Sequence, residues 1–247
     1  MYFRQVLHDE HSCTSYVIGC VSLGAALVVD PQGDVEPYIE LTSRAGIPIT
    51  HVIDTHVHAD HYSSAAQLAE RAGVSLYLGE GAEVDFAYEA LHDGEVLRIG
   101  NRSVRVLHTP GHTPEHISLL VDDWFVLTGD TLFVGDVGRV DLTLAPTEDG
   151  ELELRARKLH ASLQTLVELP DVVEVYPAHY AGSVCGRGMD GKPSSTIGRE
   201  RLTNEALALD VDSFVEFQLG NVPPLPQDFH LIKEANRSAT TSDNARS

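Results

Sequence analysis

Cysteine is scarce in this chain, and the few cysteines present form no recognisable pattern. Cys13, Cys20 and Cys185 are the three cysteines among 247 residues. An odd number without metal-ligand spacing argues against a disulfide framework and agrees with a reducing compartment. We expect Cys13 and Cys20 to be packing residues in or beside strands.

Long hydrophobic runs are also missing. No stretch of roughly eighteen apolar residues occurs, so we expect neither a membrane-spanning helix nor a membrane partner. The first ten residues end in acidic side chains and lack the apolar centre of a secretory signal. We therefore expect a cytoplasmic protein.

Basic residues are few, with 17 Lys and Arg against 37 Asp and Glu and a formal net charge of −20. Such a surface repels phosphate backbones, which excludes nucleic acid as an expected partner. We interpret the excess charge as a means of solubility.

The length and a hydrophobic fraction of 43% suit a single globular domain. We place that domain at residues 1–234. Residues 235–247 are polar and poor in apolar side chains, and we expect them to form a disordered tail.

The segment Thr55–His61 concentrates metal-binding chemistry. It contains His56, His58, Asp60 and His61. The first two histidines are two residues apart, so on an extended segment they point to the same side. Imidazole and carboxylate donors together suit zinc, iron, manganese or copper. The segment therefore predicts a metal site.

Further His and Asp residues follow short apolar runs elsewhere in the chain. These runs are rich in β-branched or aromatic residues and close on Gly, Pro or Asp, which indicates buried strands. Ligands after strand ends would meet at one rim of a sheet. The residues placed in this way are His112, Asp130 and His179.

The order of predicted elements indicates an α/β protein with two sheets and helices on the outer faces. Residues 2–30 read as three strands, and later strands are expected near 49–54, 75–78, 95–99, 102–108, 116–121, 124–128 and 172–176. Helices are expected at 34–45, 62–72 and 148–168, with helical patterning over 200–219 and a loop at 181–197.

Four motifs in this order resemble the metallo-β-lactamase superfamily. They are Thr55–His61, Pro110–His112, Thr128–Asp130 and Pro177–His179. The resemblance implies an αββα sandwich, built from two mixed sheets, with a metal site on its rim. The reaction is not implied, because the superfamily hosts many chemistries.

Two further segments resemble the persulfide dioxygenases, also called sulfur dioxygenases or ethylmalonic-encephalopathy-type proteins. One joins Gly129–Phe133 to Gly138–Asp141, and the other runs from Tyr176 to Gly198. The second is similar to dioxygenases that are often fused to a rhodanese domain, and only a short tail follows it here.

The resemblance implies one Fe(II) per chain, held by His56, His112 and Asp130 as a facial triad. In hydrolases of the superfamily the same motifs hold two Zn(II) ions, so that alternative stays open. There the first ion would take His56, His58 and His112, the second Asp60, His61 and His179, with Asp130 bridging.

The implied reaction is oxidation of a low-molecular-weight thiol persulfide, such as glutathione persulfide, by O₂ and water to sulfite and thiol. His58, Asp60 and His179 are the candidate catalytic residues for moving protons. By analogy with the family we expect a homodimer. The candidate substrate-binding residues are Arg139, Tyr176, Thr113, Cys185 and Arg187.

Basic residues near the predicted site suit a substrate that carries carboxylates. Arg187, Lys192, Arg199 and Arg201 form one cluster, and Arg139 stands apart from it. The cluster fits either a substrate-binding role or ion pairs within the fold. Cys185 could accept sulfane sulfur, since thiolates exchange with persulfides, or be an unreactive small residue.

Two other functions compete with the dioxygenase. One is a dinuclear zinc thioester hydrolase of the glyoxalase II kind, which usually carries a C-terminal helical domain. The other is a metal-binding or sulfur-sensing protein without catalysis. The histidines outside the motifs, of which His116 lies nearest to a ligand, are expected to be core or surface residues rather than ligands.

Overall fold

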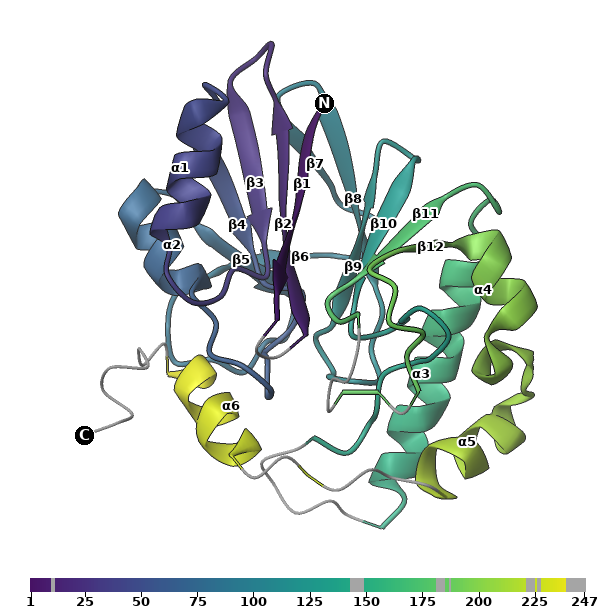
Figure 1. Ribbon diagram of the computed structural model, residues 1–247. Coiled ribbons are helices and arrows are strands. Elements are labelled where there is room, and N and C mark those ends of the chain that lie inside the picture. The colour runs from purple at the N-terminus through teal and green to yellow at the C-terminus, as the bar shows by residue number, and fades with distance from the viewer. Residues whose placement is uncertain are drawn as a thin grey trace.

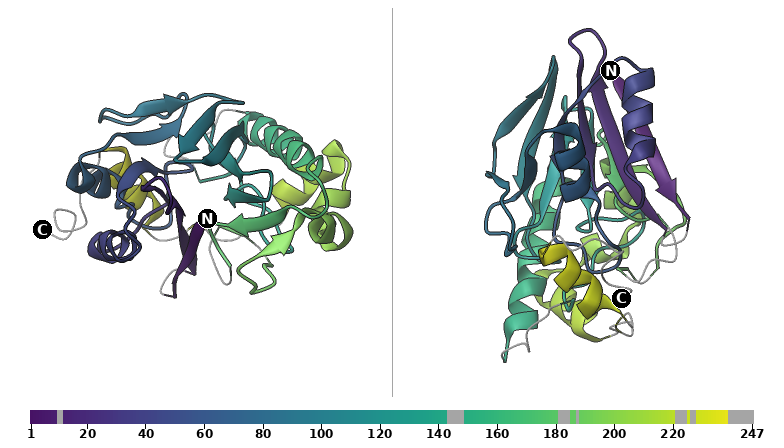
Figure 2. Two further views of the ribbon diagram at one scale, coloured as in Figure 1. Left: turned by 90° about the horizontal axis from the view of Figure 1, so that it is seen from above. Right: turned by 90° about the vertical axis from the view of Figure 1, so that its left-hand side faces the viewer.

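Two six-stranded β-sheets lie face to face in the computed structural model (Figure 1). It describes residues 1–9, 12–142, 149–180, 185–186, 188–220, 225 and 228–238. Helices cover the outer face of each sheet, as the view from above shows (Figure 2). This arrangement confirms the predicted αββα sandwich with two mixed sheets.

The first sheet combines antiparallel and parallel pairing, and has the order β1-β2-β3-β4-β5-β6. The first three strands pair antiparallel, and the next three join in parallel. Parallel neighbours need a crossover, which α1 (Glu36–Arg44) supplies between β3 and β4 and α2 (Ala65–Ala72) between β4 and β5. The strands are β1 (Tyr2–His8), β2 (Cys13–Cys20), β3 (Ala25–Val29), β4 (Ile49–Ile53), β5 (Leu76–Gly79) and β6 (Glu89–Leu91).

The second sheet has the order β12-β11-β10-β9-β8-β7. Its single parallel pair, β10 with β11, is connected by the long helix α3 (Glu151–Val167). The strands are β7 (Val96–Ile99), β8 (Arg102–His108), β9 (Ile117–Val121), β10 (Phe125–Gly129), β11 (Glu174–Pro177) and β12 (Ser195–Thr196).

Alternating side chains along the strands build the core on both faces of each sheet. In β2, Tyr16 and Ile18 belong to the cluster between the sheets, whereas Val17 packs with Tyr38 of α1. Each of these side chains is at most 1% exposed. Burying one such side chain contributes about 2 kcal/mol to stability.

The second sheet packs in the same way against α3 and α5 (Val211–Gly220). Leu159 and Leu163 of α3 share a cluster with Val126 and Val175 of the sheet, and Phe214 of α5 joins it. The sequence predicted a helix over residues 148–168 but not the partners of its apolar side chains.

Three sequence expectations need correction. The patterning over 200–219 divides into α4 (Ile197–Thr203), the 3-10 helix η1 (Glu205–Ala208) and α5. The loop expected at 181–197 ends in the short strand β12, and Thr196 caps α4 by accepting a hydrogen bond from the Arg199 amide, 3.2 Å away. Strand β6 was not expected.

The prediction of a disordered tail over residues 235–247 was wrong for residues 235–237. Helix α6 (Phe229–Arg237) includes residues 235–237, because Ala235 is buried and Asn236 bonds to the main chain of the sandwich. Residues 239–247 lie outside the described residues.

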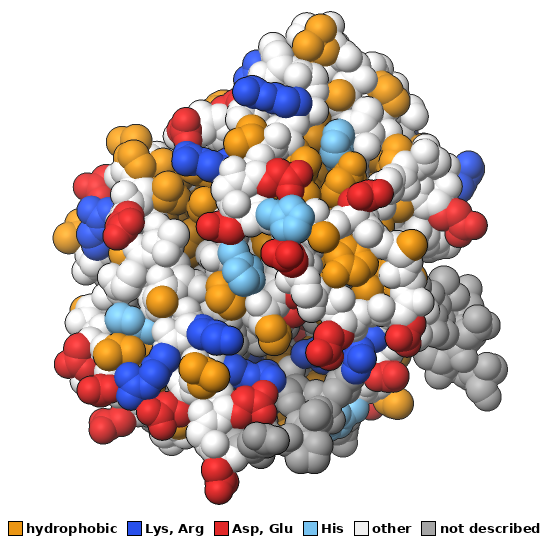
Figure 3. All heavy atoms as spheres, turned by 180° about the vertical axis from the view of Figure 1, so that it is seen from behind, with side chains coloured by type: hydrophobic (Ala, Val, Ile, Leu, Met, Phe, Trp, Pro, Cys, Tyr) orange, Lys and Arg blue, Asp and Glu red, His pale blue; other side chains and the backbone are white. Residues whose placement is uncertain are grey.

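None of the helices in the described ranges has the length and hydrophobicity that a membrane span requires. On the face shown in Figure 3, acidic and basic side chains are interspersed rather than separated by sign.

Candidate metal centre

The predicted ligands meet at one edge of the sandwich, where segments of both sheets join. Main-chain hydrogen bonds tie the two sheets together here, from the Thr14 amide to the Ala178 carbonyl (2.7 Å) and from the Ile117 amide to the Thr55 carbonyl (2.9 Å). The ligands follow β4, β8, β10 and β11 along the chain. The fold therefore brings four distant segments to one place.

His56, His112 and Asp130 converge on a common point. Their donor atoms lie within 4.8 Å of one another. Asp130 Oδ2 is 3.5 Å from His112 Nε2 and 3.9 Å from His56 Nε2, and all three side chains are at most 1% exposed. This is the two-imidazole, one-carboxylate set predicted for a single ion.

The donor atoms of this set fit a metal ion. Both carboxylate oxygens of Asp130 and the Nε2 atom of His56 are buried with no hydrogen-bond partner among the described residues. Leaving a buried carboxylate unpaired costs several kcal/mol. A cation between these atoms would remove that cost.

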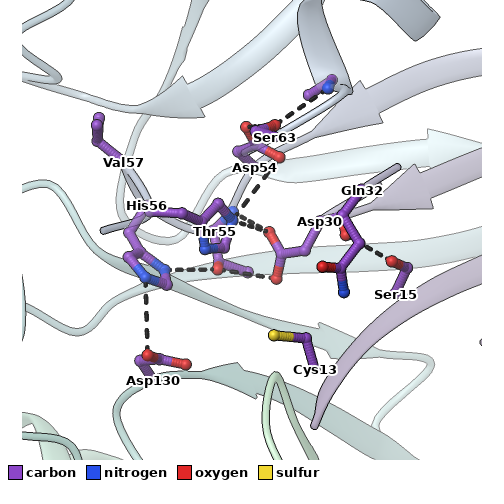
Figure 4. Close-up of polar contacts among 12 residues, drawn as sticks. Cys13, Ser15, Asp30, Gln32, Asp54, Thr55, His56, Val57, Ser63 and Asp130 are labelled. Carbon is purple, nitrogen blue, oxygen red and sulfur yellow. Dashed lines mark hydrogen bonds and ion pairs between the residues drawn. The ribbon is translucent and has the colours of Figure 1, made fainter. Parts of the chain in front are cut away.

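Hydrogen bonds behind the imidazoles fix which nitrogen faces the centre. His56 Nδ1 is 2.9 Å from the Thr55 hydroxyl, which itself donates to Asp30 Oδ2 at 2.9 Å (Figure 4). His56 Nδ1 therefore carries the proton. His112 Nδ1 donates to the Arg139 carbonyl at 2.7 Å. In both rings Nε2 keeps its lone pair for a metal.

The charge states suit coordination as well. Burial lowers the pKa of His56 well below its ordinary value, and the neighbouring His58 adds to this shift. Burial also lowers the pKa of His112, although Asp130 opposes the shift. For Asp130 burial alone would raise the pKa, but the nearby His179 and His112 hold it at about 2. His56 and His112 are thus neutral donors, whereas the pKa of His179, which burial alone would lower, is raised well above its ordinary value by Asp130 and neighbouring groups.

Asp60, His61 and His179 form a second group beside the first. His179 Nε2 lies 3.2 Å from Asp60 Oδ2 and 3.3 Å from Asp130 Oδ1, so it connects the two groups. His61 Nδ1 lies 2.9 Å from Asp60 Oδ2. Cys13 also reaches Asp60, donating from Sγ at 3.4 Å. Asp60 Oδ2 is therefore contacted by His179, His61 and Cys13.

His58 directs its Nε2 atom to two carboxylates, while its Nδ1 atom lies 4.0 Å from Asp60 Oδ1. Its Nε2 is 3.3 Å from Asp30 Oδ1 and 3.9 Å from Asp54 Oδ1. These three side chains are buried and form a group of their own. The alternative of His58 as a third imidazole ligand stays a prediction, and would rely on its Nδ1 atom.

His116 has a positioning role that the sequence did not reveal. Its Nε2 accepts a hydrogen bond from the Asp130 amide at 3.0 Å, and its ring stacks on His56 at 4.9 Å. Burial lowers its pKa to about 3, so the ring stays neutral and able to accept. Gly129 must be glycine here, because a Cβ would lie 2.5 Å from His116 Nε2. The position of His116, four residues after His112, was the one feature of the sequence that could have indicated this role.

Asn236 of α6 holds the ligand loop from outside. Its side-chain amide donates to the carbonyls of His58 (2.9 Å) and His61 (2.8 Å), and its Oδ1 accepts from the Ser63 amide at 2.9 Å. Each such bond contributes about 1 kcal/mol. Sequence reasoning missed this residue because it lies far along the chain in a polar segment.

Arg139, predicted to bind substrate, is fully engaged within the fold. It is 1% exposed, and its guanidinium donates to both carboxylate oxygens of Asp141 at 2.6 and 2.7 Å. Its carbonyl accepts from His112. The described contacts therefore give it a positioning role, and direct contact with substrate stays a prediction.

The remaining predicted substrate residues lie in different surroundings. Thr113 is buried beside His112, and its hydroxyl has no partner within the described ranges. Cys185 lies with Asp60 and His179.

Tyr176 packs against Phe3 between the sheets and donates to Glu174 at 2.7 Å, and no described contact joins it to the metal ligands. Arg187 lies outside the described residues.

The predicted basic cluster is largely paired. Lys192 and Arg199 each lie 3.3 Å from Asp190, and Arg201 lies 2.7 Å from Asp171. These contacts favour the second of the two roles considered for the cluster, ion pairs within the fold. All three pairs are exposed, so each contributes at most about 1 kcal/mol.

Replacing Asp130 should separate metal binding from folding. Asp130→Ala removes a predicted ligand, so metal affinity should fall by more than the roughly 10–100-fold that follows from mutating a residue that only hydrogen-bonds to a ligand. The metal-free variant should melt close to the metal-free wild type, because one buried charge is gone and His179 keeps Asp60 as its carboxylate partner. Metal competition with a chelator and thermal melting test this. A metal-free variant that melts much lower would make Asp130 a structural residue.

Asn236→Asp keeps the acceptor for Ser63 but removes both donors to the ligand loop. We expect a metal affinity about tenfold weaker, because the loop loses its fixed position. Leu231→Ala, at a 67% exposed position of the same helix, is the matched control and should leave affinity unchanged. Equal affinities for the two variants would exclude this role of Asn236.

Arg139→Ala should act on stability before substrate affinity. Removing the guanidinium leaves Asp141 unpaired and should cost about 2 kcal/mol of unfolding free energy. Arg105→Ala, which breaks an exposed pair with Asp123, is the control and should cost little. Denaturant unfolding measures both. A stable Arg139→Ala variant with a raised KM would instead restore the predicted substrate contact.

Known proteins similar to this chain fall into more than one functional group. The human mitochondrial persulfide dioxygenase ETHE1 is 28% identical over 93% of this chain and 85% of its own. A hydroxyacylglutathione hydrolase of Methylococcus capsulatus is 31% identical over 88% of this chain and 83% of its own.

Similarity also extends to solved structures. The crystal structure of ETHE1 from Myxococcus xanthus superposes with a TM-score of 0.84 at 30% identity, covering 98% of this chain and all of that one. The sequence matches the metallo-beta-lactamase superfamily over residues 8–179. Together with the His and Asp site at the edge of the sandwich, this match shows that the chain belongs to the metallo-beta-lactamase superfamily.

Proposed function

We propose that this protein is a persulfide dioxygenase that uses one Fe(II) held by His56, His112 and Asp130. The observation that carries the proposal is the convergence of these three side chains within 4.8 Å, while the Nε2 atom of His58 lies 3.3 Å from Asp30. Two imidazoles and one carboxylate are the facial triad of non-haem iron oxygenases, which leaves positions open for substrate and dioxygen.

The proposed reaction is R–S–SH + O₂ + H₂O → R–SH + SO₃²⁻ + 2 H⁺. A bound ferrous ion would supply the redox chemistry that dioxygen needs and that zinc lacks. The similarity to ETHE1 over nearly the whole chain supports this substrate class. Glutathione persulfide is the substrate that we propose to test first.

Residues around the triad supply the rest of the chemistry. The unpartnered Thr113 hydroxyl, beside His112, is available to donate a hydrogen bond to the persulfide. His179 lies between Asp60 and Asp130, so a proton on its Nε2 can pass to Asp60 over 3.2 Å. The reaction releases two protons, and this pair is the path that we propose for their removal.

The buried setting favours the same roles. His179 and Asp130 are not measurably exposed, and Asp60 is 8% exposed. Electrostatic interactions among them are therefore weakly screened by water. Substrate placed beside the triad would meet oriented groups that need little rearrangement.

The hydrolase remains the second candidate, because all seven residues of a two-metal site are present and a hydrolase is among the similar proteins. In that case the seven residues would hold two zinc ions, which would supply the activation of water for thioester hydrolysis.

One experiment separates the two functions. Protein purified without oxygen is analysed for metal and then given either glutathione persulfide or a glutathione thioester. We expect one iron per chain, oxygen uptake matched by sulfite release, and no thioester cleavage. The Asp130→Ala variant is the control and should do neither. Two zinc ions with thioester cleavage and no oxygen uptake would overturn the proposal in favour of the hydrolase.

A further inference from the structure

Cys13 occupies a fixed position at the seam between the two sheets. It begins β2 and forms an isolated bridge with His179. The neighbouring main chain pairs on both sides, from the Thr14 amide to the Ala178 carbonyl (2.7 Å) and from the Tyr180 amide to the Ser12 carbonyl (3.1 Å). The side chain is 1% exposed. Its thiol is therefore held against the candidate metal centre.

The thiol contacts two residues of the second ligand group. Cys13 Sγ donates to Asp60 Oδ2 at 3.4 Å and lies 3.7 Å from His61 Nδ1. The same His61 nitrogen is 2.9 Å from the same Asp60 oxygen. Cys13 Sγ and His61 Nδ1 therefore contact each other and also the same carboxylate oxygen, Asp60 Oδ2.

A second ion would need Asp60, His61 and His179 to face one point. Among the described residues, the donor atoms of Asp60 instead group with Cys13 and His61 on one side, and with His179 and Cys185 on the other. His61 directs Nδ1 to Asp60, while its Nε2 is buried without a partner in the described ranges. The space on the Cys13 side of Asp60 is filled by sulfur.

We propose that Cys13 determines how many metal ions this protein holds. By filling the space beside Asp60 and His61, and by donating to the shared oxygen, its thiol keeps a second divalent ion out. The triad is left complete, because His56 and His112 face Asp130 Oδ2 and neither contacts the thiol. The inference rests on the proposed function, because a single ion is what the dioxygenase uses.

The test measures metal stoichiometry rather than activity. Full-length protein is stripped of metal, given an excess of Zn²⁺ without oxygen, freed of unbound metal and analysed by native mass spectrometry and elemental analysis. Cys13→Ala removes the thiol, and Cys13→Ser keeps a donor. Cys20→Ala removes the buried cysteine at the opposite end of the same strand and is the matched control. Cys13→Gly is a second deletion of the thiol, for use if the alanine variant does not fold.

We expect one zinc on the wild type, Cys13→Ser and Cys20→Ala, and two on Cys13→Ala. One zinc on every folded variant would overturn the inference, while the oxygen-uptake experiment would still judge the dioxygenase. Two zincs on the wild type would also overturn it. In that case a thiolate-to-metal absorption band with Co²⁺, lost in Cys13→Ser, would identify Cys13 as a ligand instead.

Discussion

The burial of the Asp130 carboxylate among imidazole rings is the constraint on which this site depends. Both oxygens are shielded from water and face imidazole nitrogens, two of which carry lone pairs fixed by hydrogen bonds behind them. In an ordinary core such a carboxylate would be strongly destabilising. A positive charge among these side chains offsets that cost, and it would come from the nearby His179 without a metal and from the ion when a metal is bound.

The surrounding scaffold serves to hold this arrangement in place. Asp30 orients Thr55 and through it His56, His116 holds the main chain of Asp130, and Asn236 holds the loop that carries His58 and His61. Each contact joins segments that are distant in the sequence. Because each ligand of the triad is backed by a fixed partner, we expect little movement there when a metal binds.

The same fold supports one-metal and two-metal chemistry, so the fold cannot determine the reaction. In this chain His58 Nε2 lies 3.3 Å from Asp30, and Asp60 is contacted by His61 and by the thiol of Cys13. Our proposal of a single ion rests on these neighbours, because the ligand residues themselves are common to both kinds of site.

The sequence by itself determined the sandwich and the candidate ligands, because both follow from local patterns. Alternating apolar strands predicted the sheets, and histidines and aspartates after strand ends predicted where ligands gather. The sequence could not show that Arg139 is paired with Asp141, that His116 supports Asp130, or that residues 235–237 are helical and bonded to the ligand loop. Only the tertiary structure decided these points, because each depends on which distant groups become neighbours once water is excluded. A hydrogen bond between distant residues produces no local sequence pattern, whereas a strand or a clustered metal motif does.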